Sequence, residues 1–279
     1  MLISGGGSGH EPAHAGFVGE GLLDAAIAGE VFSSPSADKI RNVIDNLGSQ
    51  KGTLLIVKNY AGDVLNFAIA KDTSRIEHIE ALVVKDDISG EISGRKIERG
   101  VAGTILVHKV VGAAADKGYS LEEVKRVGQK MADNLRTIGI SSSPCIIPDT
   151  GKGNFELAEG EAELGIGIHG EMGVERIKLL PADEIVQKMY SFIKKSEGFI
   201  TPGVEVALIV NGMGGTALMD LYIVNNSINS IFKKQGLIVY KNLVGNFMTS
   251  LEMKGFSITV ARLDNELKEL LDYPCESLA

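Results

Sequence analysis

Short apolar runs, each long enough for one buried strand, alternate along this chain with stretches of helical periodicity. Residues 52–58 form such a run, a helical pattern follows at 64–70, and residues 80–84 supply the next strand. Strands that are apolar throughout must be covered on both faces, and the helices of βαβ units provide that cover. The pattern therefore predicts a doubly wound, mainly parallel α/β sheet in the first part of the chain.

A longer apolar segment at 103–115 has no clear period, but its length and alanine-rich end favour a buried helix. The Ser-x-x-Glu pattern of Ser120 and Glu123 is typical of a capping box, in which a hydroxyl and a carboxylate satisfy the first N–H groups of a helix. This helix is expected to run to about Leu135. Residues 138–148, which follow, are rich in serine and proline, so the regular alternation of strand and helix patterns is interrupted there.

We predict a domain boundary near residue 137, which gives one α/β domain at 1–137 and a second, with a more mixed sheet, at 138–279. The elements expected in the second domain are a glycine-containing strand at 163–171, helices at 182–195 and 217–234, and strands at 204–211, 236–241 and 255–261. The glycine cluster at 212–215 is interpreted as a strand-to-helix turn, because it lacks the lysine and the spacing of a phosphate-binding P-loop.

The amino-acid composition limits the classes of protein to which this chain can belong. Of 279 residues, 44% are hydrophobic and 23% are charged, as expected of a globular chain with a sizeable core. The net charge of −8 disfavours nucleic acid or an anionic membrane as a partner. No apolar run is long enough to span a bilayer, and no signal-peptide pattern is visible. Cys145 and Cys275 lack a CxxC pattern or a nearby histidine, so we expect a reduced, cytoplasmic protein without a metal site.

Glycine density is highest at residues 5–9, directly before His10. Glycines let the backbone approach a ligand closely and present successive N–H groups, and a histidine beside them can transfer protons near neutral pH. This segment is therefore a candidate wall of a small-molecule site. A flexible turn between a strand and a helix explains the glycines equally well, and the sequence leaves both interpretations open.

Polar residues also follow the predicted strand 52–58, namely Lys58, Asn59, Tyr60 and Asp63. Open α/β sheets bind their ligands at the carboxyl ends of parallel strands, so these side chains could bind a polyhydroxylated substrate with Asp63 as general base. Alternatively, Asp63 caps the helix that follows, and its spacing taken alone favours the cap.

His169 lies in the glycine-containing segment 165–171, where no large neighbour shields its imidazole. Such a histidine can act as a nucleophile toward a carbonyl, although a core histidine with satisfied hydrogen bonds fits the same pattern. His14 stands at helical spacing from the preceding histidine, but no carboxylate or third histidine supports a metal site there. His78 and His108 are interpreted as structural.

Taken together and in order, these motifs resemble the substrate-binding K subunit family of dihydroxyacetone kinase. The resemblance rests on Gly-Gly-Gly-Ser-Gly-His-Glu-Pro at 5–12, Lys-Asn-Tyr-x-Gly-Asp at 58–63, Gly-Ile-Gly-Ile-His-Gly-Glu at 165–171 and Thr-Ser-Leu-Glu-Met-Lys-Gly-Phe-Ser at 249–257. It implies two α/β domains with an architecture related to DegV-like fatty-acid-binding proteins, and a homodimer. It also implies a site built mainly by the first domain, to which the second contributes a histidine.

The resemblance implies covalent chemistry at His169, whose Nε2 would bond to the C2 carbonyl carbon of dihydroxyacetone and form a hemiaminal. This requirement for a carbonyl would reject glycerol. Asp63 would take the proton from the attacking terminal hydroxyl, and His10 would hydrogen-bond the substrate and assist hemiaminal formation or phosphoryl transfer. The pocket would be completed by Gly7, Ser8, Gly9 and Lys58.

No phosphoryl donor is expected in this chain. The resemblance is to the separate K subunit of the phosphotransferase-system type, for which a partner L subunit carries the phosphoryl group on bound ADP with magnesium. An M protein recharges that partner in a phosphoenolpyruvate-dependent system, so no metal ligands are expected here. The alternative is a paralogous co-activator that binds dihydroxyacetone and signals to a transcriptional regulator. Retention of Asp63 and His10 favours the kinase.

The chain departs from the family pattern in two places. Family members carry a further segment before the glycine run, so we expect a misassigned start codon or a fragment rather than a functional truncation. In addition, residues 85–100 differ from the Gly-Arg-Arg-Gly sequence usual in relatives. We expect this segment to shape the surface on which the partner docks.

Overall fold

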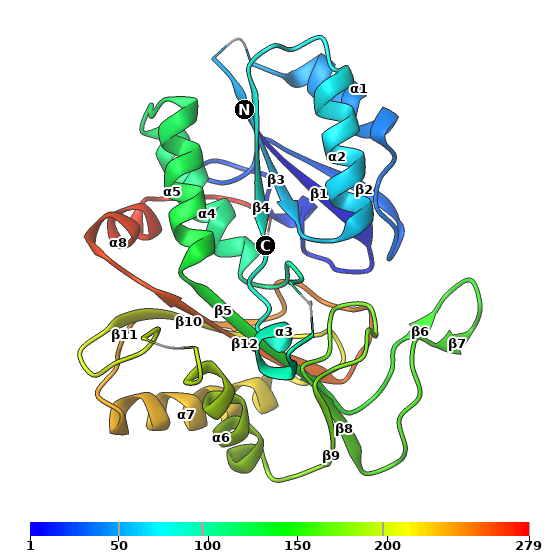
Figure 1. The fold of residues 1–279 in the computed structure, drawn as a ribbon, viewed down its shortest axis with the longest axis vertical. Coiled ribbons are helices and arrows are strands. Elements are labelled where there is room, and N and C mark those ends of the chain that lie inside the picture. Colours follow the sequence, from blue (N-terminus) through cyan, green and yellow to red (C-terminus); the bar gives the residue numbers. More distant parts are fainter. Residues whose placement is uncertain (50, 96–97, 197, 279) are drawn as a thin grey trace. The chain divides into compact units, whose positions relative to one another are not determined.

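The computed structural model describes residues 1–49, 51–95, 98–196 and 198–278 (Figure 1). The chain forms two compact units: unit 1 consists of Met1–Lys85, Thr104–Asp133 and Asn265–Ala279, and unit 2 consists of Asp86–Gly103 and Asn134–Asp264. The single boundary predicted near residue 137 lies close to one point where the chain passes between them. It does not separate the units, because the 86–103 segment belongs with unit 2 and the last segment returns to unit 1.

Unit 1 is built on four parallel strands in the order β2-β1-β3-β4. The strands span Leu2–Ser8 (β1), Ala25–Val31 (β2), Thr53–Lys58 (β3) and Ile79–Val84 (β4), and a short 3₁₀ helix, η1, spans Ala15–Phe17. Every residue of β3 is buried, as its uninterrupted apolar run predicts. The predicted parallel sheet is therefore confirmed.

One face of this sheet is covered by α1 (Ala37–Leu47) and α2 (Ala61–Thr73), as Figure 1 shows. Ile40 of α1 and Phe67 of α2 join Leu55 of β3 in a single apolar cluster. Burying a large apolar side chain of this kind stabilises the fold by roughly 1.5–3 kcal/mol. The helix predicted to follow β3 is thus confirmed.

The other face carries α4 (Thr104–Asp116) and α5 (Leu121–Asp133), and α8 (Asn265–Asp272) packs against α4 (Figure 1). The apolar segment of unclear period is therefore a buried helix, as predicted. The predicted capping box is half formed. Ser120 Oγ accepts the N–H of Glu123 at 3.3 Å, whereas the carboxylate of Glu123 pairs with an arginine in the next turn.

Unit 2 contains a six-stranded sheet in the order β11-β10-β12-β5-β8-β9, in which β10 and β11 are parallel and the other neighbours are antiparallel. The predicted mixed sheet is therefore confirmed. Its strands span Leu135–Ser141 (β5), Glu161–Leu164 (β8), Glu175–Lys178 (β9), Glu205–Gly212 (β10), Ile238–Gly245 (β11) and Gly255–Arg262 (β12). β5 is not predicted from the sequence, where this stretch has the pattern of a helix end followed by a serine- and proline-rich loop.

One face of the six-stranded sheet is covered by α6 (Ala182–Ile193) and α7 (Leu218–Lys234), both predicted from the sequence (Figure 1). The short elements of unit 2 are α3 (Ser89–Ser93) and the paired strands β6 (Ile146–Ile147) and β7 (Lys152–Gly153). Among the residues that the structure describes, no helix is long and apolar enough to cross a membrane.

Candidate active site

Residues 5–8, the first part of the glycine-rich segment 5–9, form the end of β1. The glycines among them pack closely against neighbouring backbone. A Cβ at Gly5 would collide with the carbonyl oxygen of Ile27 on β2, and a Cβ at Gly7 would lie 2.7 Å from the backbone nitrogen of Ser33. Side chains larger than hydrogen would push these segments apart. The interpretation of this stretch as a flexible turn is therefore wrong for Gly5, Gly6 and Gly7, which form part of a sheet, whereas Gly9 follows the strand in a bend.

His10 follows the strand and is completely buried. Its ring stacks on Phe32, with ring centroids 5.1 Å apart and planes inclined by 18°. Gly9 has a φ of +97°, and its N–H donates to the Glu11 carboxylate at 3.0 Å. The Ser8 hydroxyl donates to a backbone carbonyl of β2 at 2.7 Å. These contacts hold the His10 ring in one position beside the end of β1.

Lys58 and Asp63 lie at the carboxyl end of β3, the neighbour of β1 in the sheet. Lys58 is the last residue of β3 and is 1% exposed, with Nζ 5.5 Å from the ring centroid of Tyr60. Asp63 lies in the first turn of α2 and is 3% exposed. The interpretation of Asp63 as the helix cap is wrong, because Tyr60 occupies the N-cap position. The positive end of the helix dipole favours the ionised Asp63 carboxylate.

The structure therefore places the predicted residues of unit 1 at the carboxyl ends of two adjacent parallel strands. Open α/β sheets bind their ligands at this edge. The residues concerned are Gly7, Ser8, Gly9, His10, Lys58 and Asp63. His169, the remaining predicted site residue, belongs to unit 2.

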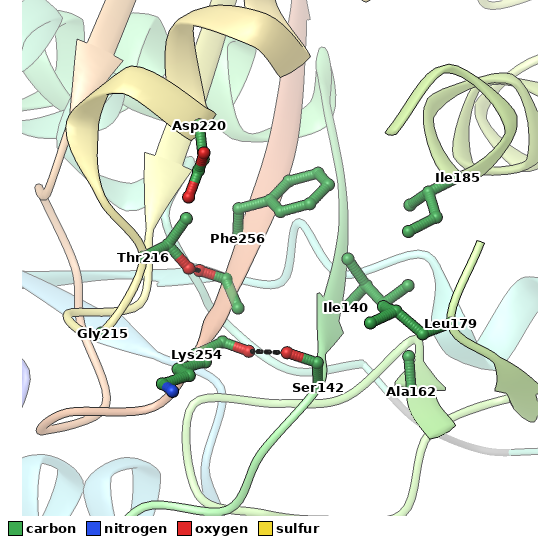
Figure 2. Close-up of a pocket in the computed structure, with 11 residues that line it drawn as sticks. Ile140, Ser142, Ala162, Leu179, Ile185, Gly215, Thr216, Asp220, Lys254 and Phe256 are labelled. Carbon is green, nitrogen blue, oxygen red and sulfur yellow. Dashed lines mark hydrogen bonds between the residues drawn. The ribbon is translucent and has the colours of Figure 1, made fainter. Parts of the chain in front are cut away.

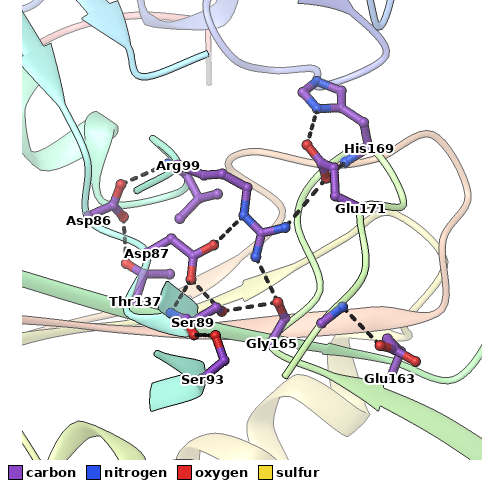
Figure 3. A network of polar contacts seen from close by, with 12 residues as sticks. Asp86, Asp87, Ser89, Ser93, Arg99, Thr137, Glu163, Gly165, His169 and Glu171 are labelled. Atoms are coloured by element: carbon purple, nitrogen blue, oxygen red, sulfur yellow. Dashed lines mark hydrogen bonds and ion pairs between the residues drawn. The ribbon is translucent and has the colours of Figure 1, made fainter. Parts of the chain in front are cut away.

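His169 lies in a turn after β8, and the extended strand predicted at 163–171 is wrong beyond Leu164. The strand ends there because Gly165 adopts a φ of +77°, which breaks the ladder. Figure 3 shows His169 facing Glu171: Nδ1 lies 2.9 Å from Oε1, and the His169 N–H donates to Oε2 at 2.5 Å. A neutral ring that donates through Nδ1 carries its lone pair on Nε2.

The His169 side chain is 20% exposed, so it is not the core histidine of the alternative interpretation. A network of charged side chains holds its partner Glu171 (Figure 3). Arg99 Nη1 lies 3.7 Å from Glu171 Oε2. Arg99 also donates through Nε to Asp87 at 2.6 Å and through Nη2 to the Gly165 carbonyl at 2.7 Å. The guanidinium thus ties the turn that carries His169 to the 86–103 segment of the same unit.

Glu171 is ionised at neutral pH. Burial opposes ionisation, but the hydrogen bond from His169 and the charge of Arg99 lower the pKa of Glu171 to about 2. A permanently charged carboxylate on Nδ1 orients the imidazole and stabilises positive charge on it. This arrangement prepares His169 Nε2 to attack an electrophile.

Asp86 fastens the same segment to β5. Its carboxylate accepts the hydroxyl of Thr137 at 2.5 Å (Figure 3). It also accepts the N–H groups of Val101 at 2.7 Å and Gly103 at 2.8 Å. Burial raises the pKa of Asp86 to about 6, and these hydrogen bonds oppose the rise. The bonds to Val101 and Gly103 stay within the segment. The bond to the Thr137 hydroxyl, with the backbone bonds that Thr137 makes to Asp86 and Ile88, joins the segment to β5 of unit 2, although the segment stands between two segments of unit 1.

Asp87 and Arg99 are not predicted from the sequence, because their pairing joins positions that share no local periodicity. Both lie in the segment 85–100, whose residues 96 and 97 are outside the described residues. That this segment shapes a docking surface stays a prediction. Glu171 could have been identified from the sequence by its spacing, because a carboxylate two residues after His169 can reach the imidazole ring.

Unit 2 also contains a pocket of about 210 Å³ with an apolar wall that includes Ile140 and Phe256 (Figure 2). On its polar side lies Asp220, and the Ser142 hydroxyl donates to the Lys254 carbonyl at 3.1 Å. The described residues that line it include none of the predicted site residues. Within the described part of the chain, no group of three or more His, Cys, Asp or Glu side chains could hold a metal ion.

The chain matches one protein family over its full length: the family model described as the Dak1 domain covers residues 1–279. It is 48% identical over 285 residues to a protein of Listeria innocua, "PTS-dependent dihydroxyacetone kinase 1, dihydroxyacetone-binding subunit DhaK". That match covers 100% of this chain and 85% of the relative.

Solved structures give the same picture. The dihydroxyacetone kinase operon co-activator Dha-DhaQ has a TM-score of 0.92 at 36% identity, over 99% of this chain and 86% of that one. The dihydroxyacetone kinase of C. freundii has a TM-score of 0.90 at 37% identity, over 100% of this chain and 51% of that one. A DegV family protein of Corynebacterium glutamicum shares the fold alone, with a TM-score of 0.56 at 13% identity over 94% of this chain and 97% of that one. The chain therefore belongs to the Dak1 family.

Proposed function

We propose that this protein is the dihydroxyacetone-binding subunit of a dihydroxyacetone kinase. It holds dihydroxyacetone as a hemiaminal on His169 while a partner subunit phosphorylates a terminal hydroxyl. The observation that carries the proposal is the pairing of His169 Nδ1 with the ionised Glu171, which leaves the ring's lone pair on Nε2. The similarity to DhaK subunits supplies the substrate class.

In the first step, the Nε2 lone pair of His169 forms a bond to the carbonyl carbon of dihydroxyacetone. The carbonyl π electrons move to its oxygen, which takes up a proton, and the imidazole becomes cationic. Glu171 stabilises this cation through the Nδ1–H hydrogen bond, and loss of the Nδ1 proton returns the ring to neutrality. A polyol without a carbonyl cannot undergo this step, so glycerol is rejected by chemistry and not by shape.

Phosphoryl transfer uses residues of unit 1. Asp63 accepts the proton of the attacking hydroxyl, and its place in the first turn of α2 favours the charged carboxylate through the helix dipole. His10 hydrogen-bonds the substrate and assists proton transfer. The substrate pocket is completed by Gly7, Ser8, Gly9 and Lys58.

The phosphoryl donor belongs to partners in this proposal. An L subunit with bound ADP and magnesium docks over the substrate, and a phosphoenolpyruvate-dependent M protein recharges it. The K subunit itself is a cytoplasmic homodimer. Docking would exclude water and align the phosphoryl group with the hydroxyl oxygen, which is the main catalytic requirement of phosphoryl transfer.

The test of the covalent step is an NMR titration with dihydroxyacetone labelled with ¹³C at the carbonyl. The ketone signal should be replaced by that of a tetrahedral carbon in the wild type but not in His169→Ala. A folded wild type that leaves the ketone signal unchanged at saturating substrate contradicts the mechanism. A double-labelled sample, with ¹⁵N in histidine, identifies the bonded nitrogen.

The second candidate function is that of a co-activator that binds dihydroxyacetone and signals to a regulator without phosphorylation. The likeness to the co-activator Dha-DhaQ favours it, since covalent trapping by His169 serves a sensor equally well. Phosphate transfer with a cognate L and M system separates the two. Adduct formation without transfer would identify the sensor, and transfer that Asp63→Asn abolishes would identify the kinase.

A further inference from the structure

Phe32 combines a strained backbone with a contact to a candidate catalytic residue. It directly follows the last residue of β2, and its φ of +54° lies in the left-handed region, which residues other than glycine rarely adopt. In the part of unit 1 that the structure describes, no other residue with a side chain has a positive φ. Such a conformation persists only where the surrounding structure imposes it, and it is most common at functional sites.

Backbone contacts hold the turn after β2 in this conformation. The Phe32 N–H donates to the carbonyl of Ser8, at the end of β1, at 3.0 Å. The next N–H, that of Ser33, donates to the Glu30 carbonyl at 3.0 Å. A Cβ on Gly7 would lie 2.9 Å from the Phe32 Cα and 2.7 Å from the Ser33 nitrogen. The turn can therefore approach β1 this closely only because residue 7 has no side chain.

The same turn places the Phe32 ring on one face of the His10 imidazole. The ring centroids are 5.1 Å apart and the planes are inclined by only 18°, which is the geometry of an offset stack. A ring stacked on the imidazole face restricts rotation of the imidazole, whereas the two ring nitrogens make their hydrogen bonds within its plane. The stack thus fixes the plane in which His10 can donate or accept a proton, without occupying either nitrogen.

Packing alone does not account for an aromatic residue at this position. A turn that needs a positive φ is ordinarily occupied by glycine, asparagine or aspartate. In the described part of the chain, the apolar cluster that contains Leu55 and Phe67 does not include Phe32, whose side chain is only partly buried. The contact that distinguishes Phe32 from a more suitable turn residue is therefore its stack on His10.

We propose that Phe32 is a positioning residue for His10, and that Gly7 serves this arrangement by leaving room for the strained turn that carries the Phe32 ring. The catalytic consequence rests on the proposed function, because it assumes that His10 assists proton transfer. The alignment of such a group matters most in the transition state, in which the proton moves. Loss of the stack should therefore lower kcat more than it raises KM.

The stack is tested without substrate by NMR of histidine-labelled protein. The ring protons of His10 should show a ring-current shift that is lost in Phe32→Leu and kept in Phe32→Tyr. Gly7→Ala should also lose the shift, because its methyl group would push the turn away from β1. An unchanged His10 spectrum in folded Phe32→Leu overturns the proposal, whether or not Gly7→Ala folds.

The matched control for this measurement is Phe17→Leu. It removes another buried aromatic ring from unit 1, one whose centroid lies 6.4 Å from that of His108. The His10 signals should therefore be the same in Phe17→Leu as in the wild type. An equal change of the His10 signals in Phe17→Leu and Phe32→Leu would indicate a general loosening of the unit and would contradict a specific role of Phe32.

The kinetic test uses the two Phe32 variants in a phosphate-transfer assay. Phe32→Leu should lower kcat by about tenfold or more and keep KM within about threefold of the wild type, because misalignment forfeits part of the roughly 10²–10⁴-fold that acid–base catalysis contributes. Phe32→Tyr should restore kcat. Equal loss of kcat in both folded variants, or a change in KM alone, would overturn the proposal. A wild type without transfer activity would reject the proposed function instead, while the NMR comparison would still decide whether Phe32 positions His10.

Discussion

The imidazole of His169 and the carboxylate of Glu171 meet twice: Nδ1 lies 2.9 Å from Oε1, and the backbone N–H of His169 donates to Oε2 at 2.5 Å. The double contact fixes both the ring orientation and the turn that carries it. Arg99 and Asp87 continue the network into the interior of unit 2. The His169 ring is thus oriented by a network of fixed groups within one unit.

Glu171→Gln should slow adduct formation without preventing folding. The amide keeps an acceptor for Nδ1–H but loses the charge that stabilises the cationic ring, so the rate constant should fall by roughly tenfold to 100-fold. The measurement is the rate at which the labelled ketone signal disappears on mixing. Glu175→Gln is the matched control, since Glu175 pairs with a surface lysine away from His169. An unchanged rate in Glu171→Gln would remove this carboxylate from the mechanism.

Asp63→Asn should separate trapping from transfer. Removing a general base lowers phosphoryl transfer by about 100-fold or more, whereas the chemistry at His169 does not need Asp63. The variant should therefore form the hemiaminal and fail in transfer with the L and M partners. Loss of both activities together in a folded variant would contradict the division of roles between the two residues.

Gly6→Ala should weaken substrate binding more than it weakens the fold. The new methyl group would lie 2.9 Å from Lys58 Nζ, the end of a flexible side chain that can move away. Gly5→Ala offers the contrast, because its methyl group would meet the rigid backbone of β2. We expect Gly6→Ala to remain folded, with at least a tenfold higher KM and an unfolding free energy lower by about 1 kcal/mol. In Gly5→Ala, the unfolding free energy should fall by several times that amount. Urea unfolding and steady-state kinetics measure the two effects, and an unaffected KM in Gly6→Ala would show that Lys58 does not need its present position.

The buried Asp86 should make stability depend on pH. Its pKa is about 6 in the folded state and near 3.8 when unfolded, so folding is favoured while it is protonated. Its contribution is complete below about pH 4 and is lost as the pH rises through 6. The free energy of unfolding of the wild type, relative to Asp86→Asn, should therefore fall by roughly 3 kcal/mol between pH 4 and pH 7. A constant difference in urea unfolding across this range would contradict the assignment.

Much of the fold follows from local patterns, because uninterrupted apolar runs can only be buried strands or helices. The run at β3 and the amphipathic helix α6 are examples. β5 escapes this reasoning because Arg136, Thr137 and Gly139 interrupt its apolar residues. The Thr137 hydroxyl is satisfied by Asp86 and lies 2.8 Å from that of Thr259, and neither contact can be read from neighbouring sequence.

The candidate site, like the fold, can be predicted from local sequence only in part. His10, Asp63 and His169 stand in motifs that local spacing makes conspicuous, and the structure places the first two at the predicted sheet edge. Their supporting residues come from distant positions. In the Asp87–Arg99 pair and in the contact of His14 with His108, the fold brings together residues that are distant in the sequence, so no local sequence pattern predicts them.

The helix α8 belongs to unit 1 although all of β5–β12 is synthesised before it. Glu266 of α8 accepts a bond from Lys130 of α5 at 2.6 Å and also pairs with Arg126 of that helix. A ribosome must therefore release all of β5–β12 before unit 1 can acquire α8. Neither unit corresponds to one uninterrupted stretch of coding sequence, so dissecting this protein requires circular permutation or joined fragments, and simple truncation would leave both halves incomplete.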